Sequence, residues 1–266
     1  NIMVMFNQIR SKIFTSKVNL EPFPYIFIKN IFDKEYVKKL NDSLPSYKDL
    51  VGNDVMFQSK SQSKKTILPS SAKYTKLSKI KEFRDLNTNF EKLKIQIISK
   101  FKQQIHQYVK KKINPKNLKY HSSYSVMVKG YKKSPHLDRR DHLIHMIYYS
   151  DSNSEKGGEI ILNKISRNEN NEFDIFPSKN SLKVFKKYKV SKNCLLIILN
   201  VPWAYHSVKL YRGKKDRKYF YMVYDFPIKK SGSVVKNRKK GFNVNDYWKS
   251  KVSVKSKIRK KIFLTE

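Results

Sequence analysis

The pattern of apolar and polar positions divides the chain into a helical first part and a β-rich second part. Residues 22–32 are largely apolar after two prolines and predict a strand. Asp33 then offers an N-cap to a helix that ends before Pro45. Residues 46–75 are rich in serine and lysine and show little periodicity, so we expect them to form a loop.

A longer helical pattern follows this predicted loop. Thr88 and Glu91 match a capping box, in which the two side chains satisfy the first free N–H groups of a helix. Apolar residues recur every three or four positions over residues 90–108. This spacing predicts one amphipathic helix that ends before Pro115.

From residue 119 onward the pattern changes to short runs rich in β-branched and aromatic residues, separated by glycine, proline and serine. Several short strands after helices are typical of helices packed on an antiparallel sandwich or jelly roll, and we predict this mostly β, α+β class. The predicted strands lie within residues 119–131, 142–150, 157–163, 181–190, 193–201, 205–210 and 217–226.

The same patterns predict the domain organisation. Residues 1–227 are expected to form a single catalytic domain, with a helical part over about 1–115 and a jelly-roll core over about 119–227. Residues 228–266 lose the regular alternation and are expected to form a basic C-terminal tail.

Composition narrows the class of protein. The 266 residues are 39% hydrophobic and 13% aromatic, which is enough for a core and too much for a disordered chain. A single cysteine, Cys194, excludes an internal disulfide and a cysteine-based zinc finger. No apolar run is long enough to cross a bilayer, and the start of the chain does not resemble a signal peptide, so we expect a cytoplasmic protein.

Charge is the most unusual feature of the composition. Lysine and arginine total 58 against 21 acidic residues, which gives a formal net charge of +37. Such a surface attracts polyanions, including nucleic acid. However, only nine of the basic residues are arginine, the residue that phosphate-binding surfaces favour. We therefore attribute the charge chiefly to compositional bias and keep nucleic-acid binding as an alternative.

Three residues carry the chemistry that the sequence predicts. His136 and Asp138 lie two apart after a predicted strand, so in an extended chain they point to the same side. His206 begins a later strand and would complete a set of two imidazoles and one carboxylate. This set suits non-heme Fe(II) and leaves the opposite side of the metal open. His-x-Asp alone is a weak signal, because a surface histidine produces it by chance.

A basic residue follows the distal histidine at the head of the last strand. Arg217 lies eleven residues after His206, and a buried arginine is a natural bidentate partner for a carboxylate. Lys214 and Lys215 are alternatives for this role.

The order of these motifs resembles the Fe(II)/2-oxoglutarate-dependent dioxygenases, and most closely their prolyl 4-hydroxylase-like branch. The matching segments, over about residues 119–226, are PHLD, IYY, GGE, WAYHSV and the following arginine. The resemblance implies a double-stranded β-helix, that is, a cupin-like jelly roll with a metal at its open end.

The resemblance also implies the roles of individual residues. His136, Asp138 and His206 would hold catalytic Fe(II), while Arg217 and Tyr149 would hold the far carboxylate of 2-oxoglutarate. The implied reaction hydroxylates an unactivated C–H bond with O₂ and converts 2-oxoglutarate to succinate and CO₂. Ascorbate is an optional further cofactor.

The sequence leaves the substrate and two other functions open. The implied substrate is a protein side chain (prolyl or lysyl) or a sugar or other small metabolite. A jelly-roll binding module without catalysis, and a nucleic-acid-binding protein that uses its basic surface, are the alternatives.

Overall fold

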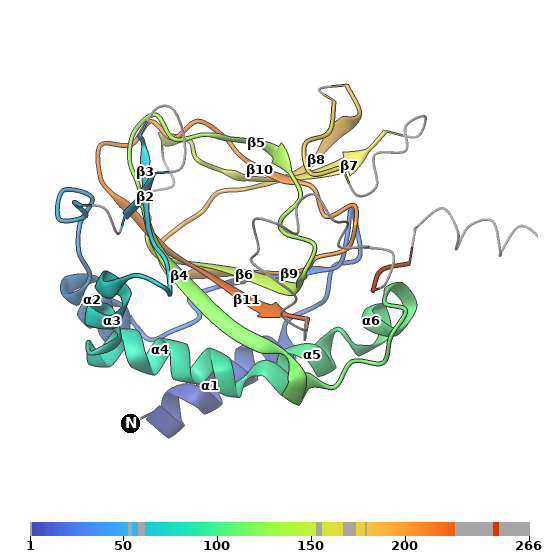
Figure 1. The fold of residues 1–266 in the computed structure, drawn as a ribbon, viewed down its shortest axis with the longest axis horizontal. Helices are drawn as coiled ribbons and strands as arrows, with labels where there is room; N and C mark the ends of the chain where they lie inside the picture. The colour runs from blue at the N-terminus through green and yellow to red at the C-terminus, as the bar shows by residue number, and fades with distance from the viewer. Residues whose placement is uncertain are drawn as a thin grey trace, which may run out of the picture.

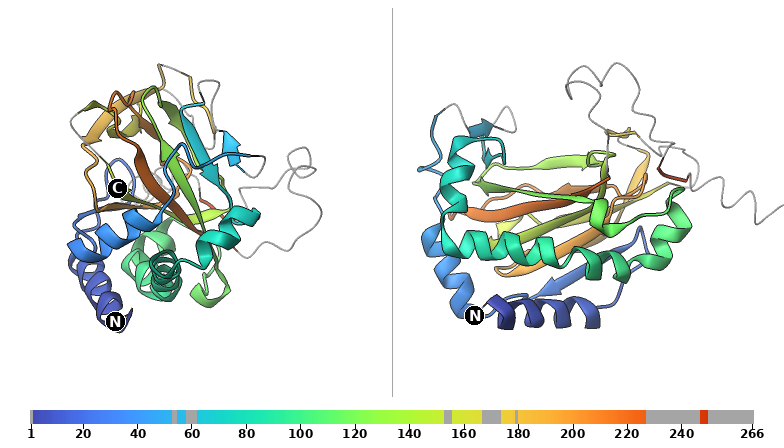
Figure 2. Two further views of the ribbon diagram at one scale, coloured as in Figure 1. Left: turned by 90° about the vertical axis from the view of Figure 1, so that its left-hand side faces the viewer. Right: turned by 60° about the horizontal axis from the view of Figure 1, so that its bottom comes forward.

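The protein is built from three layers in the computed structural model, which describes residues 2–52, 55–57, 62–152, 156–166, 174–178, 180–226 and 247–249. Helices cover one face of a large antiparallel sheet, and a smaller antiparallel sheet lies over its other face (Figure 1). Figure 2 shows the same layers from two further sides. The predicted fold class is therefore confirmed.

The helices are α1 (Ile2–Thr15), α2 (Lys34–Ser43), α3 (Ala72–Ser78), α4 (Lys81–Lys92), α5 (Lys94–Lys100) and α6 (Lys102–Tyr108). The large sheet has the strand order β1-β9-β6-β11-β4-β3-β2, formed by Tyr25–Lys29, Cys194–Leu199, His142–Asp151, Arg217–Asp225, Lys119–Met127, Lys64–Ile67 and Val55–Phe57. The small sheet has the order β5-β10-β7-β8, formed by Lys133–His136, His206–Val208, Ile160–Ile165 and Leu182–Tyr188.

The entry to the domain follows the sequence prediction closely. Strand β1 lies inside the predicted run 22–32, and α2 begins directly after Asp33. The Asp33 side chain accepts a hydrogen bond of 2.7 Å from the Tyr36 backbone N–H. This bond satisfies one of the N–H groups that a helix start leaves free, which explains why the helix begins there.

The predicted loop over residues 46–75 is wrong in part. Strands β2 and β3 and the start of α3 lie within it. Strand β3 pairs with β4, and the Thr66 and Ser125 hydroxyls share a hydrogen bond of 2.8 Å. The contact residues of both strands are polar, so β3 lacks the alternation of apolar and polar residues from which strands were predicted. Tertiary pairing forms the strand instead.

The predicted single helix over residues 90–108 is also wrong in its boundaries. Three shorter helices, α4, α5 and α6, replace it, with breaks at Leu93 and Phe101. Thr88 lies inside α4, which begins after Ile80, so the predicted capping box is not a helix start. The apolar spacing continues through both breaks because Leu93 and Phe101 remain fully buried.

The side chains of strand β11 alternate between the two faces of the large sheet, one packed on the helices and the other facing the small sheet. Phe220 packs on Phe83 of α4, and the Tyr224 hydroxyl donates to the Phe90 carbonyl, so these residues face the helices. Tyr219 and Tyr221 alternate with them and face the small sheet. The helical layer thus completes an apolar core on one face and leaves the other face for polar chemistry.

Most of the predicted basic tail, residues 228–266, lies outside the described residues. Tyr247–Lys249 are described, and Trp248 is 1% exposed. Its indole N–H donates to the Arg140 carbonyl at 3.3 Å. This short segment therefore packs against the loop that follows the His136/Asp138 motif. Within the described ranges, no helix combines the length and apolar character that crossing a bilayer requires.

Candidate metal centre

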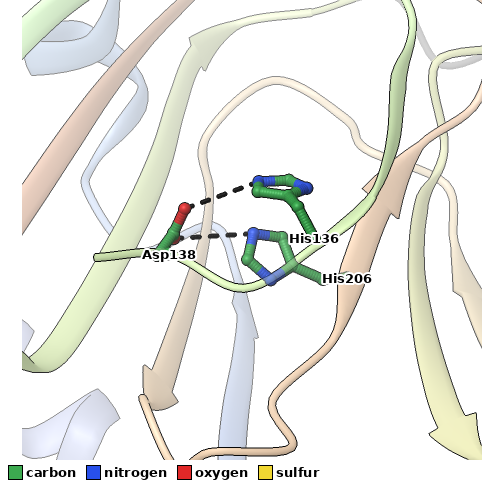
Figure 3. A group of neighbouring side chains, drawn as sticks. All are labelled: His136, Asp138 and His206. Atoms are coloured by element: carbon green, nitrogen blue, oxygen red, sulfur yellow. Dashed lines mark ion pairs between the residues drawn. The ribbon is translucent and has the colours of Figure 1, made fainter. Parts of the chain in front are cut away.

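The small sheet brings the two predicted histidine ligands together. Strand β5 ends at His136 and β10 begins at His206, and the antiparallel register sets these two residues directly opposite each other. Their ring centroids are 4.5 Å apart. Asp138 follows β5 by two residues, and potential ligand atoms of all three residues lie within 4.8 Å of one another. We call His136, Asp138 and His206 the triad (Figure 3).

Both imidazoles of the triad present the same nitrogen to Asp138. The Nε2 atoms of His136 and His206 lie 3.4 and 3.6 Å from its carboxylate oxygens. The Nδ1 atoms lie 2.9 and 3.1 Å from the backbone carbonyls of Ser134 and Ala204. A carbonyl only accepts, so each Nδ1 carries the proton and donates. In this tautomer each Nε2 has a lone pair that a metal can accept, and the carbonyls fix the ring orientations.

The ionisation states suit metal binding as well. Burial lowers the pKa of His206 to about 4, against the attraction of Asp138, so its imidazole is neutral near pH 7. Burial alone would raise the pKa of Asp138, but the neighbouring histidines hold it well below its usual range. A metal ligand must be deprotonated to bind, and both of these side chains are.

The chemistry of the triad fits a divalent transition metal. Two imidazole nitrogens and one carboxylate oxygen on one side form the donor set typical of non-heme Fe(II). The Oδ2 atom of Asp138 is buried and forms no hydrogen bond within the described residues. Such an atom costs about 1–3 kcal/mol when nothing compensates it, and a bound cation would do so.

A further histidine lies beside the triad, and the sequence reasoning did not identify it as part of the site. His145 on β6 is fully buried, and its Nδ1 lies 3.0 Å from Oδ2 of Asp138. Its ring centroid is 5.0 Å from that of His206. Burial lowers the pKa of His145 to about 3, so the ring is neutral. Neither ring nitrogen forms a hydrogen bond within the described part of the chain.

The predicted carboxylate anchor lies inside the protein. Arg217 is fully buried at the start of β11, and the centre of its guanidinium is 5.7 Å from the ring centroid of Tyr149. Lys214 and Lys215 are exposed, so the structure favours Arg217 among the three candidates. The structure thus brings Arg217 and Tyr149 together, and their role toward a carboxylate stays a prediction.

The Gly157-Gly158 pair explains how the guanidinium is held. Arg217 donates from Nη1 to the Gly158 carbonyl at 2.5 Å and from Nη2 to the Gly157 carbonyl at 3.2 Å. Both glycines have positive φ, and a Cβ on Gly158 would lie 2.3 Å from Nη1. Only glycine allows this approach, which accounts for the motif in the sequence.

A second group of histidine and aspartate side chains lies at one end of the large sheet. We call Asp141, His142 and Asp225 the strand-end cluster, whose potential ligand atoms also lie within 4.8 Å of one another. His142 Nδ1 lies 2.5 Å from one oxygen of Asp225, and His121 Nδ1 lies 3.2 Å from the other. Arg139 forms an ion pair with Asp141.

Comparisons with known proteins were informative at the level of structure. No family model matches the chain, and no curated protein matches its sequence. The α-ketoglutarate-dependent non-heme epimerase SnoN from nogalamycin biosynthesis matches with a TM-score of 0.51 and 8% identity, over 84% of each chain.

Two prolyl hydroxylases match with lower scores. The enzyme from Pseudomonas putida has a TM-score of 0.46 and 12% identity, over 86% of this chain and 94% of its own. A prolyl hydroxylase from Trichoplax adhaerens, solved with a hypoxia-inducible-factor peptide, has a TM-score of 0.44 and 13% identity, over 84% and 90%.

At such identities the likeness establishes the fold. This chain has the jelly-roll fold of the 2-oxoglutarate-dependent non-heme iron enzymes, as the match to the epimerase shows. The fold that the sequence resemblance implied is therefore confirmed.

Proposed function

We propose that this protein is an Fe(II)- and 2-oxoglutarate-dependent dioxygenase that hydroxylates an unactivated C–H bond. The observation that carries the proposal is the triad. Two imidazoles, each oriented by a backbone carbonyl, direct Nε2 at the space beside one carboxylate. We further propose that residues 1–227 act as one catalytic domain. A cytoplasmic location stays a prediction of the sequence.

The residues of the chain have distinct tasks in this proposal. His136, Asp138 and His206 would hold Fe(II), which supplies the activation of O₂ that the reaction requires. Arg217 and Tyr149 would hold the far carboxylate of 2-oxoglutarate and so orient its keto acid end toward the triad. The two sheets exclude bulk water, which strengthens these charged contacts.

The substrate class follows the resemblance. A prolyl or lysyl side chain of a protein, or a sugar or other small metabolite, would enter at the open positions of the metal.

The two alternatives, a binding module without catalysis and a nucleic-acid-binding protein, would not depend on a metal at the triad. A jelly-roll binding module does not need imidazoles that backbone carbonyls orient around a buried carboxylate, and each such polar group is costly to bury. A nucleic-acid-binding protein would use the surface charge, and its binding would fall steeply with salt.

The decisive experiment measures conversion of 2-oxoglutarate to succinate by the Fe(II)-loaded protein. We expect slow conversion without substrate, and its loss in His206→Ala. The matched control is His106→Ala, which removes an exposed histidine on α6. Equal conversion in the wild type and His206→Ala would refute the assignment. Tight, salt-sensitive RNA or DNA binding without any conversion would favour the nucleic-acid alternative.

A further inference from the structure

The carboxylate of the triad lies on a loop, whereas both of its histidines lie on strands. His136 and His206 are paired across β5 and β10, and this register fixes their positions. Asp138 belongs to residues 137–141, which connect β5 to β6 without helix or strand structure. We call residues 137–141 the ligand loop. A metal ligand on a loop keeps its geometry only if other parts of the molecule hold the loop in place.

Hydrogen bonds from four other segments hold the backbone of the ligand loop. Three of these bonds, of 3.0, 2.8 and 2.9 Å, join Leu137 to Ile175, Arg139 to Asn200 and Asp141 to Phe226. The fourth comes from Trp248, whose indole N–H donates to the Arg140 carbonyl at 3.3 Å. Asn200 and Phe226 directly follow β9 and β11, so the sheet positions them. Trp248 instead comes from a segment beyond the last strand.

Trp248 lies close to the metal ligand itself. Its side chain is 1% exposed. Together with Leu137, Asp138 and Arg140 it lines a small pocket. The indole therefore both binds the ligand loop and fills space beside the residue that would bind the metal.

The helical layer anchors the backbone of Trp248. Residues 247–249 run antiparallel to the residues that end α6, with a bridge between Val109 and Trp248. Two backbone hydrogen bonds of 2.8 Å flank this bridge and join Lys110 to Tyr247 and Lys249 to Tyr108. Figure 1 shows the segment, drawn in red, beside the end of α6. The position from which the indole projects is thus fixed.

Aromatic packing fixes the orientation of the indole. Trp248 meets Phe226 edge to face, with ring centroids 5.5 Å apart and an interplanar angle of 80°. Tyr247 stacks on the same phenylalanine at 4.4 Å. Because the Phe226 N–H also donates to the Asp141 carbonyl, these aromatic residues and the ligand loop form one connected unit. Removing the indole would release the loop at Arg140 and leave a cavity beside it.

We propose that Trp248 is a positioning residue of the metal centre. Its indole fixes the ligand loop so that the Asp138 carboxylate stays at binding distance from the metal that His136 and His206 hold. This inference rests on the proposed function, because it concerns the affinity of the triad for a metal ion. It adds that a residue beyond the last strand, which is not itself a ligand, sets part of this affinity.

The test measures dissociation constants for Mn(II) on the full chain. Trp248→Phe keeps an aromatic ring but lacks the indole N–H, and Trp248→Ala removes both. The control is Phe83→Leu, which trims a buried residue that packs on Phe220 at the helical face of the large sheet. Denaturant midpoints with and without Mn(II) give a second readout, because a bound metal stabilises the folded protein according to its affinity.

We expect Trp248→Ala to weaken Mn(II) binding at least tenfold, within the range usual for residues that support metal ligands. Trp248→Phe should weaken it about threefold, as expected from one lost hydrogen bond. Phe83→Leu should change the constant less than twofold, although it lowers the midpoint of the metal-free protein. The rise of the midpoint on adding Mn(II) should shrink in Trp248→Ala and match the wild type in Phe83→Leu.

Two results would overturn the role of Trp248 and leave the triad assignment intact. One is an unchanged constant in Trp248→Ala, and the other is an equal loss of affinity in Trp248→Ala and Phe83→Leu. If Trp248→Ala does not fold, Trp248→Phe decides, and an unchanged constant in that variant would overturn the proposal. Failure of the wild type to bind Mn(II) would instead overturn the metal centre and this inference with it.

Discussion

The chain carries two clusters of histidine and aspartate only three residues apart in sequence, and they differ in how the side chains are oriented. In the triad, both histidines direct Nε2 at Asp138 while a backbone carbonyl holds each Nδ1. In the strand-end cluster, His142 directs Nδ1 at Asp225, and Arg139 neutralises Asp141. Similar residues therefore produce two different electrostatic environments.

The difference shows that composition alone does not define a metal site. The carbonyl contacts of the triad leave a lone pair on each Nε2, and Oδ2 of Asp138 is left without a hydrogen bond within the described residues. In the strand-end cluster, one imidazole N–H group and a guanidinium already donate to the carboxylates. We interpret the triad as a metal centre and the strand-end cluster as a clamp that joins the ends of β4, β6 and β11.

The strongest test of this comparison removes one histidine from each cluster. His206→Ala should weaken Fe(II) or Mn(II) binding at least 100-fold, because it deletes a ligand. Loss of a residue that only hydrogen-bonds to a ligand usually costs about 10–100-fold in metal affinity. His142→Ala should change the dissociation constant less than threefold. Metal titrations of both variants measure this. A similar loss in both would mean that the two clusters do not differ as proposed.

A second test concerns His145, whose contact with Asp138 distinguishes the triad from the strand-end cluster. We expect His145→Phe to weaken metal binding about tenfold, because the carboxylate loses the imidazole beside it. The metal-free variant should be more stable by about 1 kcal/mol, since an imidazole without hydrogen bonds is removed from the interior. Metal titration tests the expected loss of affinity, and chemical denaturation tests the expected gain in stability. Lower stability with unchanged metal affinity would show that His145 only fills space.

The third test breaks the clamp. Asp225→Asn replaces the carboxylate that accepts from the His142 imidazole and lies beside the His121 imidazole with a neutral side chain. We expect the free energy of unfolding to fall by about 1.5 kcal/mol, the typical contribution of a hydrogen bond to a charged group. Metal affinity at the triad should not change. A loss of metal affinity without a loss of stability would reverse the two assignments.

Particular residues show where the sequence was sufficient and where it was not. The triad was predictable because His136 and Asp138 are neighbours and His206 follows a recognisable aromatic motif. Strand β3 was missed because its residues are polar and it forms only by pairing with β4, which local periodicity does not report. His145 was missed because its contact with Asp138 depends on how β6 lies beside the loop after β5.

The smallest expected effect is the dependence of the stability of the metal-free protein on pH, which we expect to arise from the triad region rather than from the strand-end cluster. Burial lowers the pKa values of His206 and His145 to about 4 and about 3, below the value of about 6.5 expected in the unfolded chain. Between these values the unfolded chain binds protons that the folded, metal-free protein does not. Its stability is therefore full above about pH 6.5 and falls as pH decreases toward 4.

Denaturant midpoints of the metal-free protein at pH 7 and pH 5 measure this dependence, and His206→Gln should reduce the difference between them. His121, beside the strand-end cluster, also has a pKa lowered by burial, but its side chain is 39% exposed, so it contributes less. His121→Gln should accordingly leave most of the difference in place. If His121→Gln removed it instead, the pH-sensitive histidines would belong to the clamp rather than to the metal centre.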